Sequence, residues 1–346
     1  MDFSILIPVY RSEEVLAETV RSALSQQGDF SYEIVLVEDG SPDGSGAVCD
    51  DLAAAYPDMI RVIHRPHTGT VLTRRVAVAA AEGDFIVWLD SDDLLEPACL
   101  STLMKYRRAY PQADVILYEL SFFFEDGHPE ESRPPLAETP RLIAGEEKKE
   151  LYRLLIEGNR LDSLCIKAIR RELMQNDPAD YAPYSANPYG EDALHCLYPL
   201  TEAASVLLIP EVLYRYRMRT GSVMHVFDTA QLDKRYNELK LAFFEPYLRH
   251  WGMDSADDRA KLKASAFKGV LDGILYFYEG NYDRKAVLHY ASDFADSHPE
   301  LKELAGNKAI GRKQQVLFRL FAAKKIRLIE AGYQLLRTGR KITHRG

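Results

Sequence analysis

Cysteine is scarce in this sequence, and its four residues are scattered. No two of them have C-x-x-C spacing, and none is paired with histidine in the manner of a zinc finger. They are Cys49, Cys99, Cys165 and Cys196. This scatter argues against a structural zinc site and against a disulfide framework, and it is consistent with a reducing cytosol.

Long apolar runs and glycine-rich phosphate loops are also missing. No stretch approaches the ~18 apolar residues of a spanning helix, and no basic segment precedes the short apolar run at Ser4, so we expect neither a signal peptide nor a membrane span. The first predicted strand is followed by no G-x-G-x-x-G, and no G-x-x-x-x-G-K-[ST] occurs. These absences exclude the dinucleotide-binding Rossmann fingerprint and the P-loop class.

Net positive charge is confined to the C-terminal end. From Asn307 onward the chain has eleven basic residues and one acid, a net charge of +10, so the remainder carries −19 of the total −9. A mainly acidic body argues against nucleic acid as a partner.

The sequence does contain an apolar run, Phe85–Leu89, that leads directly into the carboxylates of Asp90, Asp92 and Asp93. Its length and lack of polar alternation predict a strand buried on both faces. Crowded carboxylates repel one another, and hard oxygen ligands favour Mg²⁺ or Mn²⁺ between them. The alternative is an Asp-rich turn that caps a helix starting near Pro97, and of the three carboxylates we expect Asp93 to form this cap.

Strand and helix signals alternate four times in the first 90 residues. The expected strands cover 4–10, 33–37, 60–63 and 85–89. Three helices are expected between them: one that starts at Ser12, one that ends at about Tyr56, and one over 70–81. This order predicts parallel βαβ units with helices on both faces of a sheet. Pro8 is expected to end the pairing of the first strand. Asp39 and the Asp90 group would then share the C-terminal edge of the sheet, where ligands bind.

The rest of the chain changes character near Val226. Before it we expect a helix at 97–109, a strand or hairpin at 114–124, a surface loop at 125–139, a helix at 146–157, a helix from Ala193, and a pair of strands at 206–210 and 212–216. After about Ala230 the pattern indicates only helices. We therefore expect one domain over residues 1–225 and a helical region over 226–346.

Five motifs together resemble a known enzyme family. They are Ile7-Pro8-Val9-Tyr10, the stretch from Glu38 to Asp43, Asp90-Ser91-Asp92-Asp93, Gly190-Glu191-Asp192, and Tyr214-Arg215 followed by Gly221-Ser222. Their order and spacing are similar to those of the family two inverting glycosyltransferases, especially the bacterial enzymes that build cell-surface polysaccharides. The resemblance implies the GT-A fold, a mainly parallel α/β sheet flanked by helices, here with a helical C-terminal extension.

The resemblance also assigns roles to the acidic residues. It implies that Asp192 is the catalytic base, that Asp92 is the metal ligand, and that Asp90 lies near the ribose or in the outer shell of the metal. Glu191 would lie on the acceptor side. A carboxylate in the place of Asp192 would take the proton of the acceptor hydroxyl during a single inverting displacement.

Donor binding is implied for a second set of residues: Pro8, Tyr10, Asp39, Arg74, Asp90 and Arg217. Asp39 matches the residue that contacts the nucleotide base. Arg74 would face the diphosphate or the acidic loop, which consists of residues 90–93. For Arg217 a surface role is the alternative.

The chain departs from the family pattern at several places. His67, Thr73 and Arg75 replace Asn, Ala and Asn of N-x-G-x-x-x-A-R-N, and Cys165 stands in the place of a Trp. We expect His67 to be a loop residue and Arg75 to be a solvated helix charge. Most of the charges in the basic stretch at 163–174 are likewise expected to be solvated; they are Lys167, Arg170 and Arg171.

The implied function is an inverting glycosyltransferase that uses Mg²⁺ or Mn²⁺ and a nucleotide-diphosphate sugar, UDP-linked, with a glycan or lipid-linked acceptor. A cytoplasmic location is implied. A sugar-nucleotidyltransferase is disfavoured because the N-terminus lacks a Gly-rich basic loop for triphosphate. A non-catalytic nucleotide-sugar-binding scaffold is disfavoured because Asp39, Asp92 and Asp192 are all present.

The tail from about residue 307 has a basic amphipathic pattern. Apolar residues such as Leu317, Leu320 and Phe321 alternate with Lys and Arg. This pattern suits a helix that lies on an anionic membrane surface, here the inner face of the cell membrane. A helix packed on the protein's own core, with its basic side chains solvated, fits the pattern equally well.

Overall fold

The structure is a computed structural model that describes residues 1–125, 127–157, 160–185, 191–218, 239–279 and 282–331. The chain forms two compact units. One consists of Met1–Tyr152 with Arg160–Thr220, and the other of Arg153–Asn159 with Gly221–Gly346. The domain boundary predicted near Val226 lies outside the described residues.

Four parallel strands form the first half of the sheet in the α/β unit. They are β1 (Phe3–Val9), β2 (Tyr32–Glu38), β3 (Ile60–His64) and β4 (Phe85–Trp88), in the spatial order β3-β2-β1-β4. All seven residues of β1 and all four of β4 are buried, as the apolar runs predict. The prediction of a mainly parallel α/β sheet with flanking helices is confirmed.

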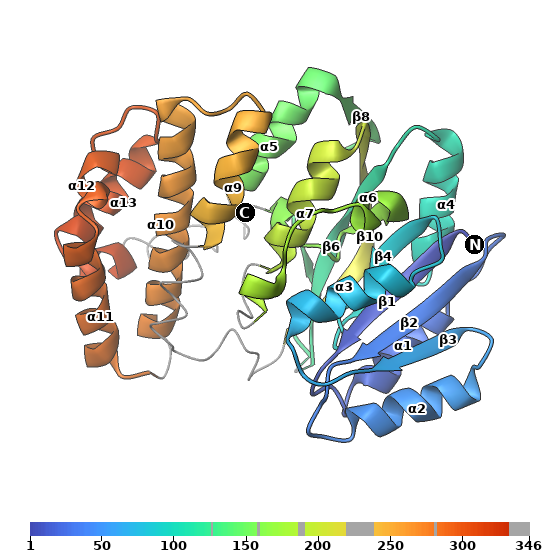
Figure 1. Ribbon diagram of the computed structural model, residues 1–346. Helices are drawn as coiled ribbons and strands as arrows, with labels where there is room; N and C mark the ends of the chain where they lie inside the picture. Colours follow the sequence, from blue (N-terminus) through green and yellow to red (C-terminus); the bar gives the residue numbers. More distant parts are fainter. Residues whose placement is uncertain (126, 158–159, 186–190, 219–238, 280–281, 332–346) are drawn as a thin grey trace. The chain divides into compact units, whose positions relative to one another are not determined.

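Helices α1 (Leu16–Leu24) and α2 (Ser45–Ala55) pack against each other, whereas α3 (Thr70–Ala80) packs on β1 and β2. Figure 1 shows α3 in front of the strands. The chain runs outward from β1 to β3 and returns through α3 to β4, so right-handed crossovers put α3 on the other face. The direction reverses between β1 and β4, and a crevice for ligands is expected at the carboxyl ends of these strands.

Two sequence predictions about the first strand and helix were wrong. Pro8 does not end the pairing of β1 with β2, which continues to Val9 opposite Glu38; the ladder with β4 ends earlier, at Leu6. The helix predicted from Ser12 begins four residues later. The hydroxyl of Ser12 hydrogen-bonds the hydroxyl of Ser91 at 2.6 Å, so it joins the loop after β1 to the acidic loop after β4.

The second half of the sheet is mixed. The order continues β4-β9-β6-β10-β5, with β9 antiparallel to both of its neighbours, β6 parallel to β10, and β5 antiparallel to β10. Two short strands pair outside this path, β7 with β6 and β8 with β10. The bounds are β5 Leu94–Leu95, β6 Val115–Phe124, β7 Glu131–Ser132, β8 Arg141–Ala144, β9 Lys167–Arg170 and β10 Ser205–Met218.

Strand β10 replaces the predicted pair of strands at 206–210 and 212–216. It is one continuous strand whose register against β6 shifts between Leu208 and Tyr214, around Pro210. Proline lacks the N–H that the ladder needs, and a local irregularity accommodates it. The first part of β10 pairs with β8 and the later part with β5, so one strand reaches the acidic loop that precedes β5.

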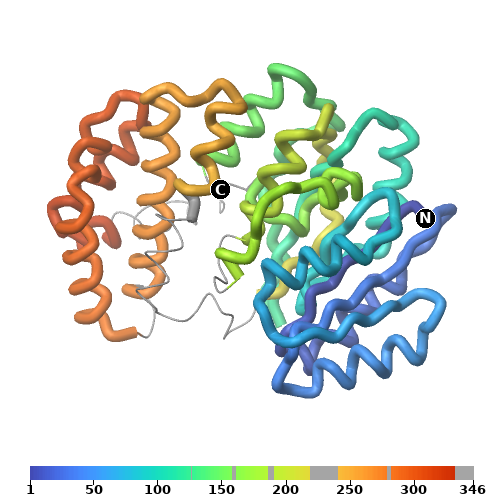
Figure 2. Tube along the Cα trace, viewed as in Figure 1, coloured from blue at the N-terminus to red at the C-terminus, as the bar shows by residue number. Residues whose placement is uncertain are grey.

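Three further helices in the described part of the α/β unit lie within a few residues of their predicted positions: α4 Cys99–Ala109, α5 Lys148–Ile156 and α7 Glu191–Glu202. The short helix α6 (Arg171–Gln175) was not predicted. The C-terminal region is helical where it is described, as predicted, with α9 Leu239–His250, α10 Ala256–Glu279, α11 Arg284–Ser297, α12 Glu300–Leu304 and α13 Arg312–Ala322. In Figure 2 the helices of the second unit run from orange at α9 to red at α13.

The helical unit has its own core around α10, which packs against α9, α11, α12 and α13. Phe318 and Phe321 of α13 are fully buried in this core. Of the two interpretations of the tail, the structure therefore supports packing for this face of α13. Val316 and Leu328 stay 53% and 56% exposed among basic side chains. Among the described residues, no helix combines the length and apolar character needed to cross a bilayer.

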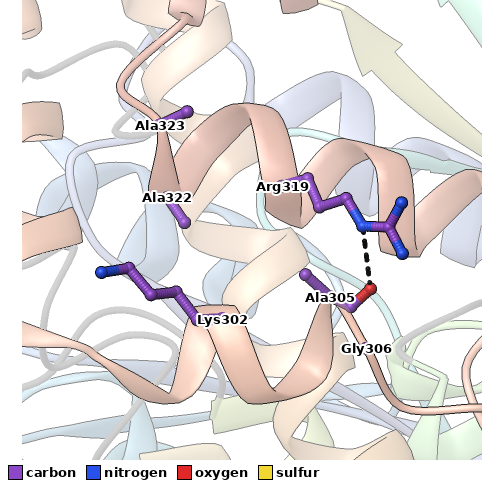
Figure 3. A pocket seen from close by; sticks show the side chains of 6 residues that line it. All are labelled: Lys302, Ala305, Gly306, Arg319, Ala322 and Ala323. Atoms are coloured by element: carbon purple, nitrogen blue, oxygen red, sulfur yellow. Dashed lines mark hydrogen bonds between the residues drawn. The ribbon is translucent and has the colours of Figure 1, made fainter.

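A cavity of about 380 Å³ opens between α12 and α13 (Figure 3). Small side chains line it, and the two cations at its rim are Lys302 and Arg319. The Arg319 Nε donates a hydrogen bond to the carbonyl of Ala305 at 3.2 Å, which fixes one side of the opening.

Candidate active site

The acidic loop directly follows β4, and hydrogen bonds from residues of β10 hold it in place. Asp93 is buried, and its carboxylate accepts hydrogen bonds from the Tyr214 hydroxyl at 2.6 Å and the Arg217 backbone N–H at 2.7 Å. The backbone N–H of Asp90 donates to the Tyr214 hydroxyl at 3.2 Å. Burial, followed by the charges of Asp92 and Asp90, raises the pKa of Asp93 well above its usual value.

Asp93 therefore anchors the loop, and the prediction that it caps the next helix was wrong. Helix α4 starts at Cys99, after Ala98 at the N-cap position, and no side chain caps it. The carboxylate of Asp93 instead accepts hydrogen bonds from β10, which lies more than 100 residues later in the chain.

Arg217 holds the back of the same loop. Its Nε donates to the Asp92 carbonyl at 2.6 Å, and its two terminal nitrogens contact Glu18 and Glu125, each at 2.6 Å. The side chain is 4% exposed. The alternative of a surface role for Arg217 was wrong, because the side chain is buried and every nitrogen of its guanidinium contacts a protein oxygen. Its role in donor binding stays a prediction.

Arg74 on α3 collects three carboxylates from two distant parts of the chain. Its guanidinium lies 3.3 Å from Asp90 and 3.8 Å from Glu191, and it donates a close hydrogen bond to Asp192. The side chain is 4% exposed and lies 5.7 Å from the centre of the Trp88 ring. Arg74 thus joins the acidic loop after β4 to the first turn of α7.

The crowding of carboxylates changes their acidity. Desolvation, together with the charges of Asp192 and Asp92, raises the pKa of Asp90 to about 6, although Arg74 acts in the opposite direction. Desolvation and the charge of Asp192 likewise raise the pKa of Glu191 to about 7. Carboxylates with raised pKa values in a shared crevice are typical of functional sites.

The carboxylate of Asp192 has two supports. One oxygen contacts Arg74, and the other accepts the Leu164 backbone N–H at 3.3 Å. The loop around Leu164 is fixed by Lys167, whose ammonium donates to the carbonyls of Leu161, at 2.8 Å, and Ser163. Lys167 is fully buried, so the prediction that it is solvated was wrong.

Arg75 was also predicted to be solvated, and this was wrong. Its guanidinium donates to the carbonyls of Met174, at 2.8 Å, and Asp177, at 3.3 Å, and lies 5.1 Å from the centre of the Tyr181 ring. The other predicted solvated charges are bound as well: Arg170 contacts Asp114, and Arg171 donates to the Gly83 carbonyl. These contacts tie α3 and β4 to the chain that precedes Asp192.

A second polar cluster lies after β1 and β2. The carboxylate of Asp39 is 3% exposed and accepts hydrogen bonds from the backbone N–H groups of Thr68 and Gly69 and from Nδ1 of His67. The Tyr10 ring stacks on His67 with ring centres 4.3 Å apart. Pro8 lies within β1, two residues before Tyr10.

The predicted site residues thus fall into two groups at the carboxyl edge of the sheet. Contacts join Arg74, Asp90, Glu191 and Asp192 in one group, and Tyr10 and Asp39 meet through His67 in the other. The predicted motif residues Gly190, Gly221 and Ser222 lie outside the described residues. Sequence reasoning missed the roles of Glu18 and Tyr214, because their partners lie 199 and 121 positions away in the chain.

The donor chemistry of the acidic loop fits a Mg²⁺ or Mn²⁺ ion only in part. Among the described residues, no group of three His, Cys, Asp or Glu side chains is arranged to hold a metal ion. Asp90 and Asp92 nevertheless supply hard oxygens from one loop. A Mg²⁺ ion that also contacts substrate phosphates and waters needs only one or two protein carboxylates.

Comparisons with known proteins agree with this architecture. Residues 4–176 match the family model described as glycosyl transferase family 2. The uncharacterized glycosyltransferase EpsJ of Bacillus subtilis (strain 168) is 29% identical over 248 residues, which cover 70% of each protein. The minor teichoic acid biosynthesis protein GgaB of the same strain is 25% identical over 249 residues, 71% of this chain but 26% of GgaB.

A solved structure has the same fold. The crystal structure of residues 1–349 of S. aureus TarS in complex with UDP-GlcNAc superposes with a TM-score of 0.65 over 97% of this chain and 92% of that one, at 20% identity. At this identity the likeness establishes the fold, which is the GT-A architecture of a mixed sheet between helices.

Proposed function

The chain belongs to glycosyl transferase family 2 and is a glycosyltransferase, and from this premise we propose that it uses a UDP-sugar donor. The sugar passes with inversion to a hydroxyl group of a glycan or lipid-linked acceptor, in the synthesis of a cell-surface polysaccharide. The printed names of the Bacillus relatives, one of them a teichoic acid biosynthesis protein, support this context.

One observation carries the proposal: Asp90, Glu191 and Asp192 surround the buried Arg74 at the carboxyl edge of β4, beside the point where the sheet order reverses. This is where an α/β sheet binds its ligand. Asp192 is 28% exposed, so its carboxylate can reach a hydroxyl in the crevice while Arg74 and the Leu164 N–H keep it oriented.

In the proposed reaction Asp192 acts as the general base. It removes the proton of the acceptor hydroxyl as the oxygen attacks the anomeric carbon, and the nucleoside diphosphate leaves from the opposite face. Glu191 lies beside Asp192, on the acceptor side in this proposal. Its pKa is raised to about 7, so near neutral pH its carboxyl group is partly protonated and can donate or accept a hydrogen bond.

Asp92 and Asp90 would hold Mg²⁺ or Mn²⁺ in the acidic loop. Such an ion, when bound, neutralises the charge that builds on the leaving diphosphate. Ser12, Tyr214 and Arg217 keep the loop in position for this task. In this proposal Tyr10 and Asp39, which follow β1 and β2, form the nucleoside end of the donor site together with Pro8 of β1.

The test is Asp192→Asn. We expect transfer from the UDP-sugar to fall by about 10³-fold, since a positioned general base contributes roughly 10²–10⁴ in rate. UDP binding, followed by titration calorimetry, should be retained because Asp192 does not touch the nucleoside end. Undiminished transfer in this variant would exclude Asp192 as the base.

We further propose that the enzyme works at the inner face of the cell membrane. The described part of the tail, residues 307–331, has seven basic residues and one acid, and Val316 and Leu328 are exposed among them. Lys302, which lines the cavity in Figure 3 together with Arg319, adds one more positive charge. Basic charge with exposed apolar groups suits an anionic lipid surface.

A further inference from the structure

The protein itself fills the acceptor sites of the buried Asp39 carboxylate. One oxygen accepts the Thr68 backbone N–H at 3.0 Å and the Thr68 hydroxyl at 3.5 Å, with the Arg65 guanidinium 3.6 Å away. The other accepts the Gly69 backbone N–H at 2.9 Å and Nδ1 of His67 at 2.8 Å. Turning this buried carboxylate toward a ligand would leave several N–H groups unpaired, which is costly in the interior.

The contacts of His67 fix which ring nitrogen carries the proton. Nδ1 lies 2.8 Å from the Asp39 carboxylate and 3.1 Å from the Asp39 carbonyl oxygen. Both oxygens can only accept, so Nδ1 must carry a hydrogen. In the neutral ring Nε2 then bears a lone pair and is a hydrogen-bond acceptor.

The imidazole is held firmly but is open on one edge. The Tyr10 ring covers one face at 4.3 Å with an interplanar angle of 16°. Gly40, at φ +65°, lets the backbone of His67 approach closely, since a side-chain carbon there would lie 2.6 Å from the His67 nitrogen. The His67 side chain is 51% exposed, and within the described ranges its Nε2 has no hydrogen-bond partner.

We propose that His67 reads the nucleobase of the donor, and that Asp39 is the positioning residue that fixes its tautomer. Nε2 of His67 accepts the N3–H of uracil. Cytosine presents a lone pair at the same position and would place two acceptors opposite each other. This inference rests on the proposed function, in which the donor is a UDP-sugar bound at the carboxyl ends of β1 and β2.

The experiment compares three nucleotides in titration calorimetry with the full-length protein: UDP, CDP and UDP methylated at N3. The wild type should bind UDP about tenfold more tightly than either of the others, the value of one hydrogen bond of average strength. His67→Phe keeps a ring for Tyr10 but lacks Nε2, so its preference for UDP should disappear.

His64→Phe is the matched control, because His64 is a similarly exposed histidine at the end of β3 whose nitrogens contact Glu38 and Asp50. It should keep the wild-type preference. If His67→Phe does not fold, His67→Leu serves, since a leucine side chain has no atom that can accept the N3–H of uracil. ¹⁵N spectra of labelled histidine supply a direct readout: UDP should shift the Nε2 resonance of His67 and leave its Nδ1–H in place.

The possible failures are distinguishable. Equal wild-type affinity for UDP and its N3-methyl derivative, tighter binding of CDP, or a preference retained in both His67 variants would overturn the role of His67 alone. A wild type that binds no uridine nucleotide and transfers no sugar from any UDP-sugar would overturn the proposed function together with this inference.

Discussion

Single residues set the electrostatic balance of the site, and Arg74 has the largest share. Its guanidinium contacts Asp90, Glu191 and Asp192 and is 4% exposed. A buried cation that loses its partners, or a group of buried anions that loses its cation, is strongly destabilising because the remaining charge is uncompensated.

Arg74→Gln should therefore lower the free energy of unfolding by about 3–5 kcal/mol and abolish transfer. Urea denaturation followed by circular dichroism measures the first effect. Arg108→Gln is the control, because Arg108 forms an exposed ion pair with Asp29 and should change stability by less than about 1 kcal/mol. Equal stability of the two variants would contradict the compensating role of Arg74.

Glu191 makes stability depend on pH in a defined direction. Its pKa is raised from the reference value of 4.5 to about 7 in the folded protein, so between these values the folded state holds a proton that the unfolded state has lost. Stability then falls as pH rises through this window. Glu191→Gln should gain about 1–3 kcal/mol relative to the wild type between pH 5 and pH 8.

Thermal or urea unfolding at the two pH values measures this gain. Glu150→Gln, an exposed acid on α5 paired with Arg141, is the matched substitution and should show no such change. A difference between Glu191→Gln and the wild type that does not vary with pH would contradict the shift.

At the scale of elements, the start of α3 depends on one glycine. Gly69 has φ +91° and ψ 158°, a backbone region that essentially only glycine adopts. A side-chain carbon here would also collide with the carbonyl oxygen of Ser185, in the segment that leads toward α7. Gly69 thus lets this segment lie on the N-terminus of α3.

Gly69→Ala should lower the free energy of unfolding by about 1–3 kcal/mol and weaken UDP binding, because Thr68 and Gly69 also bond Asp39. Gly145→Ala separates backbone strain from the collision of the added carbon. Gly145 also has a positive φ, +54°, but nothing lies within 4 Å of an added carbon, so this variant introduces strain without a collision. Calorimetry and urea unfolding on both variants check this, and an unaltered UDP affinity in Gly69→Ala would refute the link.

Most elements could be predicted from local pattern. The strands β1 to β4 and the helices between them follow from apolar runs and turn signals, so the prediction placed Asp39 and Asp90 at one edge. The errors came where distant residues compete with local preference. Asp93 suits a helix cap by sequence, but Tyr214 and Arg217 engage it; Lys167 looks solvated, but carbonyl groups surround its ammonium.

The contacts within the site lay further beyond sequence reasoning. The meeting of Arg74 with Asp192 requires the fold to bring together residues 118 positions apart. The family pattern pointed to Asp39 as the base contact, and only the geometry of Thr68, Gly69 and His67 reveals that its carboxylate is already occupied.

At the scale of the whole molecule, the charge of the helical unit leads to a prediction about membranes. Arg319→Glu with Arg327→Glu should reduce sedimentation of the full-length protein with phosphatidylserine vesicles by about tenfold or more, at about 1 kcal/mol for each basic residue near the surface. Phe318 and Phe321 of the same segment are buried in the helical core, so truncation would remove core side chains and substitution tests the surface better.

Lys105→Glu with Arg108→Glu changes the net charge equally, on α4 of the other unit, and should leave sedimentation unchanged. Neutral phosphatidylcholine vesicles should bind the wild type weakly, and added salt should release it from anionic ones. An equal loss of sedimentation in the two double variants would show that net charge alone causes the effect, and it would refute a membrane-binding surface on the helical unit.

The late position of β10 has a consequence for synthesis in the cell. The first four strands are complete when about a quarter of the chain has emerged from the ribosome, yet the acidic loop is fixed by Tyr214 and Arg217, 121 and 124 positions after Asp93. A nascent chain folds from its N-terminus. It can therefore form the parallel strands early, while its carboxylates gain their final arrangement only after β10 joins the sheet.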